Sequence, residues 1–229
     1  MAKMSKILKI GHRGAKGYAP ENTLIAFEKA ILMGCQGIEL DVHLSADGNI
    51  FVIHDHTTDR VTGQSGVISA LASSELKEMR IDGAHGIPLL SEVFDLVDHR
   101  ALINIELKVA EAAEPVLRLI ENYVANSWEF HEFLISSFDW TALQHVRQLH
   151  PEIPIGVLTE TDLELAAAFA KTINAETIHP QFHLLNKENT EILQQDFKVF
   201  AWTANETEDI QNLKIFGVSA IITDFPDRI

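Results

Sequence analysis

The feature that most constrains the fold is a regular alternation of short, β-branched apolar runs with longer segments of helical periodicity. The strand-like runs cover residues 7–12, 37–44, 50–54, 101–107, 133–137, 153–158, 177–179, 198–202 and 220–223. Between them, apolar residues recur three and four positions apart, as in segments 23–33 and 114–124, which is typical of one face of an amphipathic helix. Strand followed by helix along the whole chain predicts parallel βαβ units.

The length favours a closed barrel over an open sheet. The 229 residues divided among eight units give about 29 residues each, close to the roughly 30 of a βαβ unit. The alternative is an open doubly wound sheet, but no G-x-G-x-x-G turn follows the first strand-like run. We therefore predict an α/β fold, a TIM (β/α)₈ barrel, with residues 1–229 as a single domain.

One segment interrupts the alternation. Residues 55–88 are rich in Ser, Thr and Gly and contain only a short helical pattern around 75–79. A structureless loop of this length is uncommon in a compact domain. We therefore predict a small insertion that leaves the barrel after the strand ending at His54 and rejoins it near Pro88.

Composition excludes several classes of protein. The chain carries 18 Lys and Arg against 33 Asp and Glu, a net charge of −15, which repels nucleic acid and anionic lipid surfaces. No apolar run approaches the roughly 20 residues of a membrane-spanning helix, and the apolar stretch at 7–10 is too short for a signal peptide. The single cysteine, Cys35, excludes an internal disulfide. We expect a cytoplasmic protein without nucleic-acid partners or stable membrane insertion.

Polar residues gather at the carboxyl ends of the predicted strands, where barrel enzymes build their sites. Because strand side chains alternate between faces, Glu39 and Asp41 project together, as do Glu106 and Lys108. Three carboxylates converging at a barrel mouth would repel one another unless a cation joined them. Oxygen ligands favour a hard divalent ion, Mg²⁺ or Ca²⁺ or else Mn²⁺, over zinc.

Two histidines and a helix start complete the candidates. His12 and His54 each end an apolar run, and histidine titrates near neutral pH. Arg13 follows His12 between two glycines. Residues 20–23, Pro-Glu-Asn-Thr, are typical of a helix start with Asn22 or Thr23 as its cap.

The order and spacing of several motifs resemble the glycerophosphodiester phosphodiesterase family over nearly the whole chain. These motifs are Gly-His-Arg-Gly at 11–14, Pro-Glu-Asn-Thr at 20–23, Glu-Leu-Asp-Val-His-Leu-Ser-Ala-Asp-Gly at 39–48, His-Asp at 54–55, Ile-Pro-Leu-Leu-Ser-Glu-Val at 87–93, Asn-Ile-Glu-Leu-Lys at 104–108, Ser-Ser-Phe at 136–138, Trp-Thr-Ala-Asn at 202–205 and Ile-Thr-Asp-Phe-Pro at 222–226.

The resemblance implies metal-dependent hydrolysis of a small-molecule glycerophosphodiester to sn-glycerol 3-phosphate and an alcohol. By position, it implies that His12 and His54 are the general acid/base pair. The other implied roles are metal ligation by Glu39, Asp41 and Glu106, and substrate contact by Arg13, Lys108, Phe138 and Trp202.

Three other functions remain open at this stage. A phospholipase D-like or sphingomyelinase D-like phosphodiesterase could use the same barrel. An amidohydrolase-type barrel would use His54 and His56 on the metal, but it would leave the carboxylate cluster unexplained. The third alternative is a phosphate-binding protein that has lost catalysis. The oligomeric state, monomer or homodimer, has no sequence signal.

Overall fold

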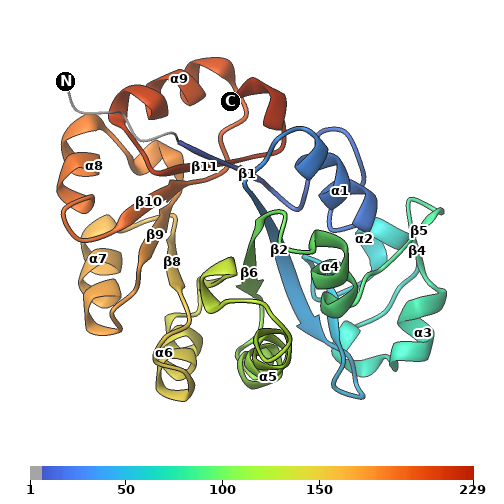
Figure 1. Ribbon diagram of the computed structural model, residues 1–229. Helices are drawn as coiled ribbons and strands as arrows, with labels where there is room; N and C mark the ends of the chain where they lie inside the picture. The colour runs from blue at the N-terminus through green and yellow to red at the C-terminus, as the bar shows by residue number, and fades with distance from the viewer. Residues whose placement is uncertain (1–6) are drawn as a thin grey trace.

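Eight parallel strands close into a barrel in the computed structural model, which describes residues 7–229 (Figure 1). The barrel strands are β1 (Leu8–Gly11), β2 (Gly37–Leu44), β6 (Leu102–Leu107), β7 (Phe133–Ser137), β8 (Ile155–Thr159), β9 (Thr177–Pro180), β10 (Lys198–Ala201) and β11 (Ala220–Thr223). Around the barrel, each strand pairs with the next barrel strand along the chain. The last strand, β11, pairs with the first, β1, and this pairing closes the barrel. The predicted TIM barrel is confirmed. Our signal-peptide prediction rests in part on residues 1–6, which lie outside the described residues.

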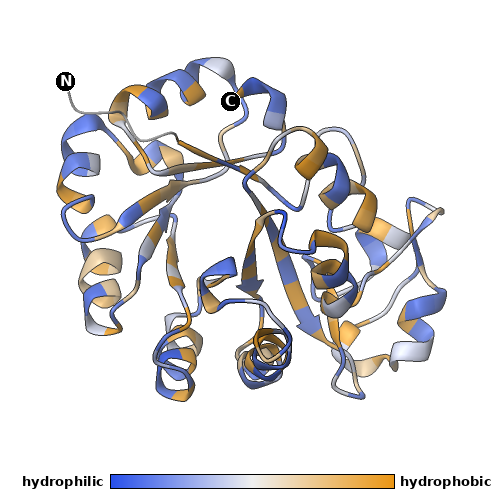
Figure 2. Ribbon diagram, in the orientation of Figure 1, coloured by the Kyte–Doolittle hydropathy of each residue, from blue (hydrophilic) through white to orange (hydrophobic). Residues whose placement is uncertain are grey.

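Amphipathic helices surround the strands. They are α1 (Leu24–Leu32), α4 (Leu90–Val97), α5 (Ala113–Val124), α6 (Trp140–Leu149), α7 (Leu163–Thr172), α8 (Lys187–Leu193) and α9 (Thr207–Phe216), with single 3₁₀ turns η2 (Ala110–Ala112), η3 (Phe130–Glu132), η4 (Phe182–Leu184) and η5 (Pro226–Arg228). Figure 2 shows the alternation of apolar and polar residues along β2. Its even positions Ile38, Leu40 and Val42 belong to the main core, which leaves its odd positions for the barrel interior. Within residues 7–229, no helix is both long enough and apolar enough to cross a membrane.

The strand-like run at 50–54 forms a ninth strand outside the closed barrel. This strand, β3 (Ile50–Val52), pairs antiparallel with the end of β2. Only five residues separate the two strands, which suffices for a hairpin but not for the crossover that a parallel strand needs. The strand stops at Val52, so His54 lies in the loop that follows it.

The segment between β3 and α4 contributes no barrel strand. It contains α2 (Asp59–Thr62), the 3₁₀ turn η1 (Ile68–Ala70), α3 (Ser73–Glu78) and a hairpin of β4 (Arg80–Ile81) and β5 (His85–Gly86). Figure 1 shows these elements at one side of the barrel. They bury a small apolar cluster of their own, formed by Phe51, Ile53, Ile68, Leu76, Met79, Ile81 and Ile87. The single domain with an insertion at 55–88 stays a prediction.

Gly14 fixes the path of the chain from β1 to α1. Its φ is +84°, and a Cβ atom there would lie 2.5 Å from the backbone carbonyl carbon of Ala26 in α1. Gly48, in the hairpin turn, has a similar φ of +79°, but a Cβ there would meet no atom within 4 Å. The two glycines therefore share a conformational requirement and differ in the space around them.

We expect Gly14→Ala to lower the free energy of unfolding by about 3 kcal/mol, because backbone strain adds to an overlap with α1. Gly48→Ala should cost about 1 kcal/mol, from strain alone. Urea unfolding of both variants measures the difference. Equal losses would show that α1 adjusts to the added methyl group.

Candidate active site

The predicted site residues converge at the carboxyl end of the barrel. His12, Lys108, Phe138 and Trp202 directly follow β1, β6, β7 and β10. One pocket is lined by eight of the nine predicted residues: His12, Arg13, Glu39, His54, Glu106, Lys108, Phe138 and Trp202. The ninth, Asp41, is 1% exposed and lies beside them.

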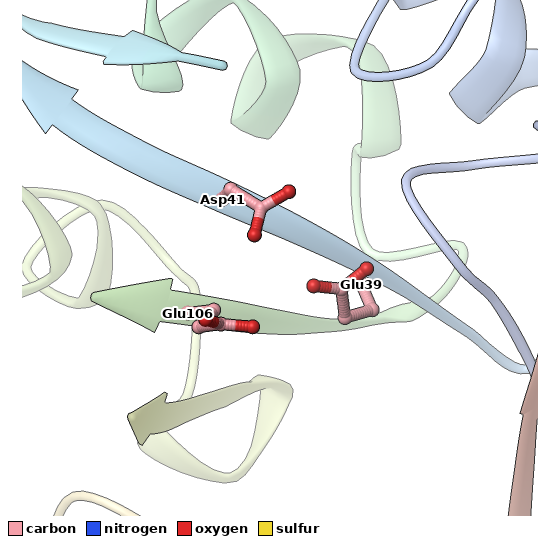
Figure 3. A group of neighbouring side chains, drawn as sticks. All are labelled: Glu39, Asp41 and Glu106. Carbon is pink, nitrogen blue, oxygen red and sulfur yellow. The ribbon is translucent and has the colours of Figure 1, made fainter. Parts of the chain in front are cut away.

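Three carboxylates from two neighbouring strands meet inside the barrel. In the parallel register of β2 and β6, Asp41 is level with Glu106, and Glu39 lies one inward-facing position earlier on β2. One carboxylate oxygen from each residue lies within 4.8 Å of the other two (Figure 3). All three residues are buried, so water screens their mutual repulsion poorly.

The electrostatics of this acidic triad (Glu39, Asp41 and Glu106) suit a hard cation. Burial and the charges of Asp41 and Glu106 raise the pKa of Glu39 well above its ordinary value. Burial and the charge of Asp41 raise the pKa of Glu106 to about 7. The Oδ1 atom of Asp41 is buried without a hydrogen-bond partner. An oxygen-only set with such an unpartnered atom could hold a divalent metal ion.

Two cationic side chains border the triad. The backbone N–H of Arg13 donates to Glu39 Oε2 at 2.8 Å, and its Nε lies 3.3 Å from Asp41 Oδ2. Arg13 has a φ of 51°, a left-handed conformation that a non-glycine residue adopts only where its surroundings hold it. The Nζ atom of Lys108 donates to Glu106 Oε1 at 2.6 Å.

Each histidine of the pocket is paired with a carboxylate through Nδ1. The Nδ1 atom of His12 lies 2.6 Å from Asp224 Oδ1, and that of His54 lies 2.7 Å from Asp55 Oδ1. Burial lowers the pKa of His12, against the opposing hydrogen bond with Asp224. A carboxylate on Nδ1 fixes the ring orientation and leaves Nε2 for proton transfer. For His54, Nε2 lies 3.3 Å from Lys108 Nζ.

No catalytic or binding role was predicted from the sequence for these two carboxylates, and Asn22 was predicted only as a candidate helix cap. Asp55 has a local signal, since it directly follows His54, whereas Asp224 is 212 residues from His12. Thr23 caps α1 as expected, its hydroxyl accepting from the N–H of Ala26. Asn22 does not cap α1. It is buried, and its Nδ2 donates to Asp41 Oδ2 at 2.9 Å.

Further polar and aromatic groups complete the pocket. Asn104 and Ser136 line it with a buried Oδ1 and a buried Oγ that have no hydrogen-bond partner, and neither was a sequence candidate. The rings of Phe138 and Trp202 meet edge to face at 5.4 Å, and Trp202 Nε1 donates to the carbonyl oxygen of His179. Phe138 is 42% exposed, so one side of this aromatic pair faces the entrance.

Fold and site together are typical of a barrel enzyme, with two imidazoles that face a cluster of buried carboxylates at the carboxyl ends of the strands. The model of the "Glycerophosphoryl diester phosphodiesterase family" matches residues 12–228, and the chain belongs to this family. Glycerophosphodiester phosphodiesterases from Bacillus altitudinis and Caldanaerobacter subterraneus are 39% and 35% identical to it, over 98% of this chain and 96% of each relative. The chain is accordingly a phosphodiesterase of this family.

Solved structures agree with this assignment. Glycerophosphodiester phosphodiesterase from Thermotoga maritima matches with a TM-score of 0.84 and 30% identity, over 97% of both chains. A phosphodiesterase from Oleispira antarctica in complex with the product sn-glycerol-3-phosphate matches with a TM-score of 0.87 and 27% identity, over 96% of this chain and 94% of that one.

The raised pKa values predict how a cation changes stability with pH. A carboxyl group whose pKa is higher in the folded chain than in the unfolded chain loses its stabilising effect as pH rises from the unfolded value through the folded one. For Glu106 this window runs from 4.5 to about 7. We therefore expect the metal-stripped protein to lose thermal stability between pH 5 and pH 8, and added Mg²⁺, Ca²⁺ or Mn²⁺ to raise Tm more at pH 8 than at pH 5.

The matched control is the triple variant Glu39→Gln, Asp41→Asn, Glu106→Gln, whose Tm should respond neither to the cations nor to this pH window. Differential scanning fluorimetry measures all combinations. A cation-induced rise in Tm that persists in the triple variant would remove the triad from the metal site.

Proposed function

We propose that this chain hydrolyses glycerophosphodiesters to sn-glycerol 3-phosphate and an alcohol, with His12 and His54 as the general acid/base pair. One observation carries the proposal: two imidazoles, each paired with a carboxylate, lie at one pocket together with Arg13, Lys108 and the acidic triad. The product bound to the Oleispira antarctica phosphodiesterase supports the same substrate class.

We propose that the enzyme is metal-dependent, with Glu39, Asp41 and Glu106 holding one divalent ion. When bound, such an ion would neutralise phosphate charge and lower the pKa of a coordinated hydroxyl. Arg13 presents a planar fork to two phosphate oxygens, and Lys108 presents a compact positive charge. These groups stabilise the charge that develops as the phosphorus–oxygen bond breaks.

The imidazoles move the protons of the reaction. One of them removes a proton from the attacking oxygen, which belongs either to water or to the neighbouring hydroxyl of the glycerol. The other delivers a proton to the oxygen of the departing alcohol. Asp224 and Asp55 hold the two rings by Nδ1, so both transfers use Nε2 atoms.

Water-soluble diesters suit the site better than intact phospholipids. Eight of the twelve residues that line the pocket are polar or charged, which suits a head-group diester, whereas two acyl chains would need an extended apolar surface. Such diesters are what remains when glycerophospholipids lose their acyl chains. We therefore propose a role in glycerophospholipid catabolism and, consistent with one buried cysteine, a cytoplasmic location.

The experiment that tests this function is a coupled assay for glycerol 3-phosphate released from glycerophosphocholine and glycerophosphoethanolamine. We expect His12→Ala and His54→Ala each to lower kcat roughly 10²- to 10⁴-fold without loss of folding, the usual contribution of a general acid or base. His145→Ala, at an exposed position on α6, is the matched control and should retain parental activity. Turnover within threefold of the parent in either test variant would refute that residue's role.

Trp202 tests the aromatic part of the pocket. We expect Trp202→Ala to raise KM roughly three- to tenfold and to change kcat less than threefold, because stacking on the glycerol face supplies mainly ground-state binding. Trp202→Phe keeps a ring but loses the hydrogen bond to the His179 carbonyl, and it should recover most of the KM. An unchanged KM in Trp202→Ala would make this tryptophan purely structural.

A further inference from the structure

One arginine outside the barrel joins the two sides of the site. Arg60 lies on α2, the short helix that follows the His54 loop. Its guanidinium donates to both oxygens of Glu21, at 2.7 and 3.0 Å. It also donates to both oxygens of Asp55, at 2.6 and 3.2 Å.

Each of these carboxylates in turn holds a residue of the proposed machinery. Glu21 Oε1 accepts from a guanidinium N–H of Arg13 at 2.9 Å, and Asp55 Oδ1 pairs with His54 Nδ1 at 2.7 Å. A continuous chain of hydrogen bonds therefore runs from Arg13 through Glu21, Arg60 and Asp55 to His54. Nitrogen-bearing side chains alternate with carboxylates along this series of hydrogen bonds, so each carboxylate lies between two nitrogen-bearing partners.

We infer that Arg60 is a positioning residue, which sets the phosphate-contacting guanidinium of Arg13 and the imidazole of His54 in fixed relation to each other. The inference rests on the roles proposed above for Arg13 and His54. It assigns to the segment between β3 and α4 an indirect part in the reaction, because this segment supplies the cation that the two carboxylates share.

Arginine is the side chain that can make this connection. Its planar group carries five N–H donors and can serve two carboxylates at once, whereas the ammonium group of lysine acts as a compact point charge. Besides Arg13 and Arg60, Lys16 lies near Glu21, at 3.9 Å from Oε2, but it has no ion pair with Asp55 among the described residues. Without Arg60, the carboxylates of Glu21 and Asp55 would no longer be joined by a shared cation.

The charges of this network support a functional rather than a stabilising role. Burial opposes ionisation of Glu21, but its hydrogen bonds with Arg60 and the charge of Arg13 lower its pKa to about 2. The hydrogen bond from Arg60 likewise lowers the pKa of Asp55. Both carboxylates are thus ionised at neutral pH. The side chain of Arg60 is 48% exposed, and ion pairs of such exposure contribute little to folding stability.

Arg100 offers a matched control. It forms a two-pronged pair with Glu28 at 2.6 and 3.0 Å, and its side chain is 40% exposed. This pair resembles the Arg60–Glu21 pair in its two-pronged geometry and in the exposure of the arginine, although Glu28 is more exposed than Glu21. It touches none of the site residues named above. Arg100→Gln therefore removes a comparable ion pair without disturbing the proposed machinery.

We expect Arg60→Gln to lower kcat roughly ten- to hundredfold, as misplacement of acting groups does, and Arg100→Gln to leave kcat within twofold of the parent. Tm should fall by similar amounts in both variants. Arg60→Lys should lie between Arg60→Gln and the parent. If Arg60→Gln proves unfolded by circular dichroism, Arg60→Lys decides: a parental kcat overturns the inference, and a loss of threefold or more supports it.

A double-mutant cycle shows whether Arg60 acts through Asp55. In an Asp55→Asn background, Arg60→Gln should lower kcat threefold or less, because one side of its connection is already broken. Fully additive losses would overturn the inference, as would a parental kcat in folded Arg60→Gln. His54→Ala separates the two proposals. If that variant keeps its turnover, the proposed role of His54 fails. If His54→Ala loses turnover while Arg60→Gln keeps the parental kcat, only the inference about Arg60 fails.

Discussion

The convergence of three buried carboxylates on one end of the barrel is the constraint that organises the rest of the site. Burial, together with repulsion within the acidic triad (Glu39, Asp41 and Glu106), raises the pKa of Glu39 and Glu106. Three neighbouring residues donate hydrogen bonds to these carboxylates. Lys108 donates to Glu106, Asn22 donates to Asp41, and Arg13 adopts a left-handed backbone that lets its N–H donate to Glu39. The local strain is thus tied to the same electrostatic cause.

Barrel closure supplies the second level of organisation. Because β1 pairs with β11, Gly11 lies level with Thr223. The residues that follow these two strands, His12 and Asp224, consequently meet although they stand at opposite ends of the chain. The second dyad has a different origin, since His54 and Asp55 are adjacent and depend on the β2–β3 hairpin for their place near Lys108. The His12–Asp224 pair joins opposite ends of the chain, whereas the His54–Asp55 pair joins adjacent residues. Both histidines line the same pocket.

The barrel and most of the residues that line the pocket could be predicted from the sequence, for identifiable physical reasons. Period-two alternation places Glu39 and Asp41 on one face, and polar residues after apolar runs indicate the carboxyl ends of strands. Alternation cannot distinguish a barrel strand from a hairpin partner, so β3 has the same apolar pattern as its neighbours. The partners of the site residues are equally invisible to local patterns. Asn22 stands where a helix cap is expected, and Asp224 has no neighbour in the sequence that indicates His12.

The charges at the mouth of the pocket bear on how a substrate anion could bind there. Among the described residues, Arg13, Lys108, Arg60 and Lys16 are cationic groups near the mouth, but each is already paired with a carboxylate of the site. Against them stand the acidic triad together with Glu21, Asp55 and Asp224, so negative groups outnumber positive ones even before the net charge of −15 is considered. A phosphodiester would therefore meet a repulsive field. A divalent cation on the triad would offset this negative charge, and it would release Arg13 and Lys108 from part of their pairing to contact phosphate oxygens. Arg13 and Lys108 would then pair with the triad before the ion binds and with the phosphate afterwards, so that metal binding and substrate binding would be coupled through these two side chains.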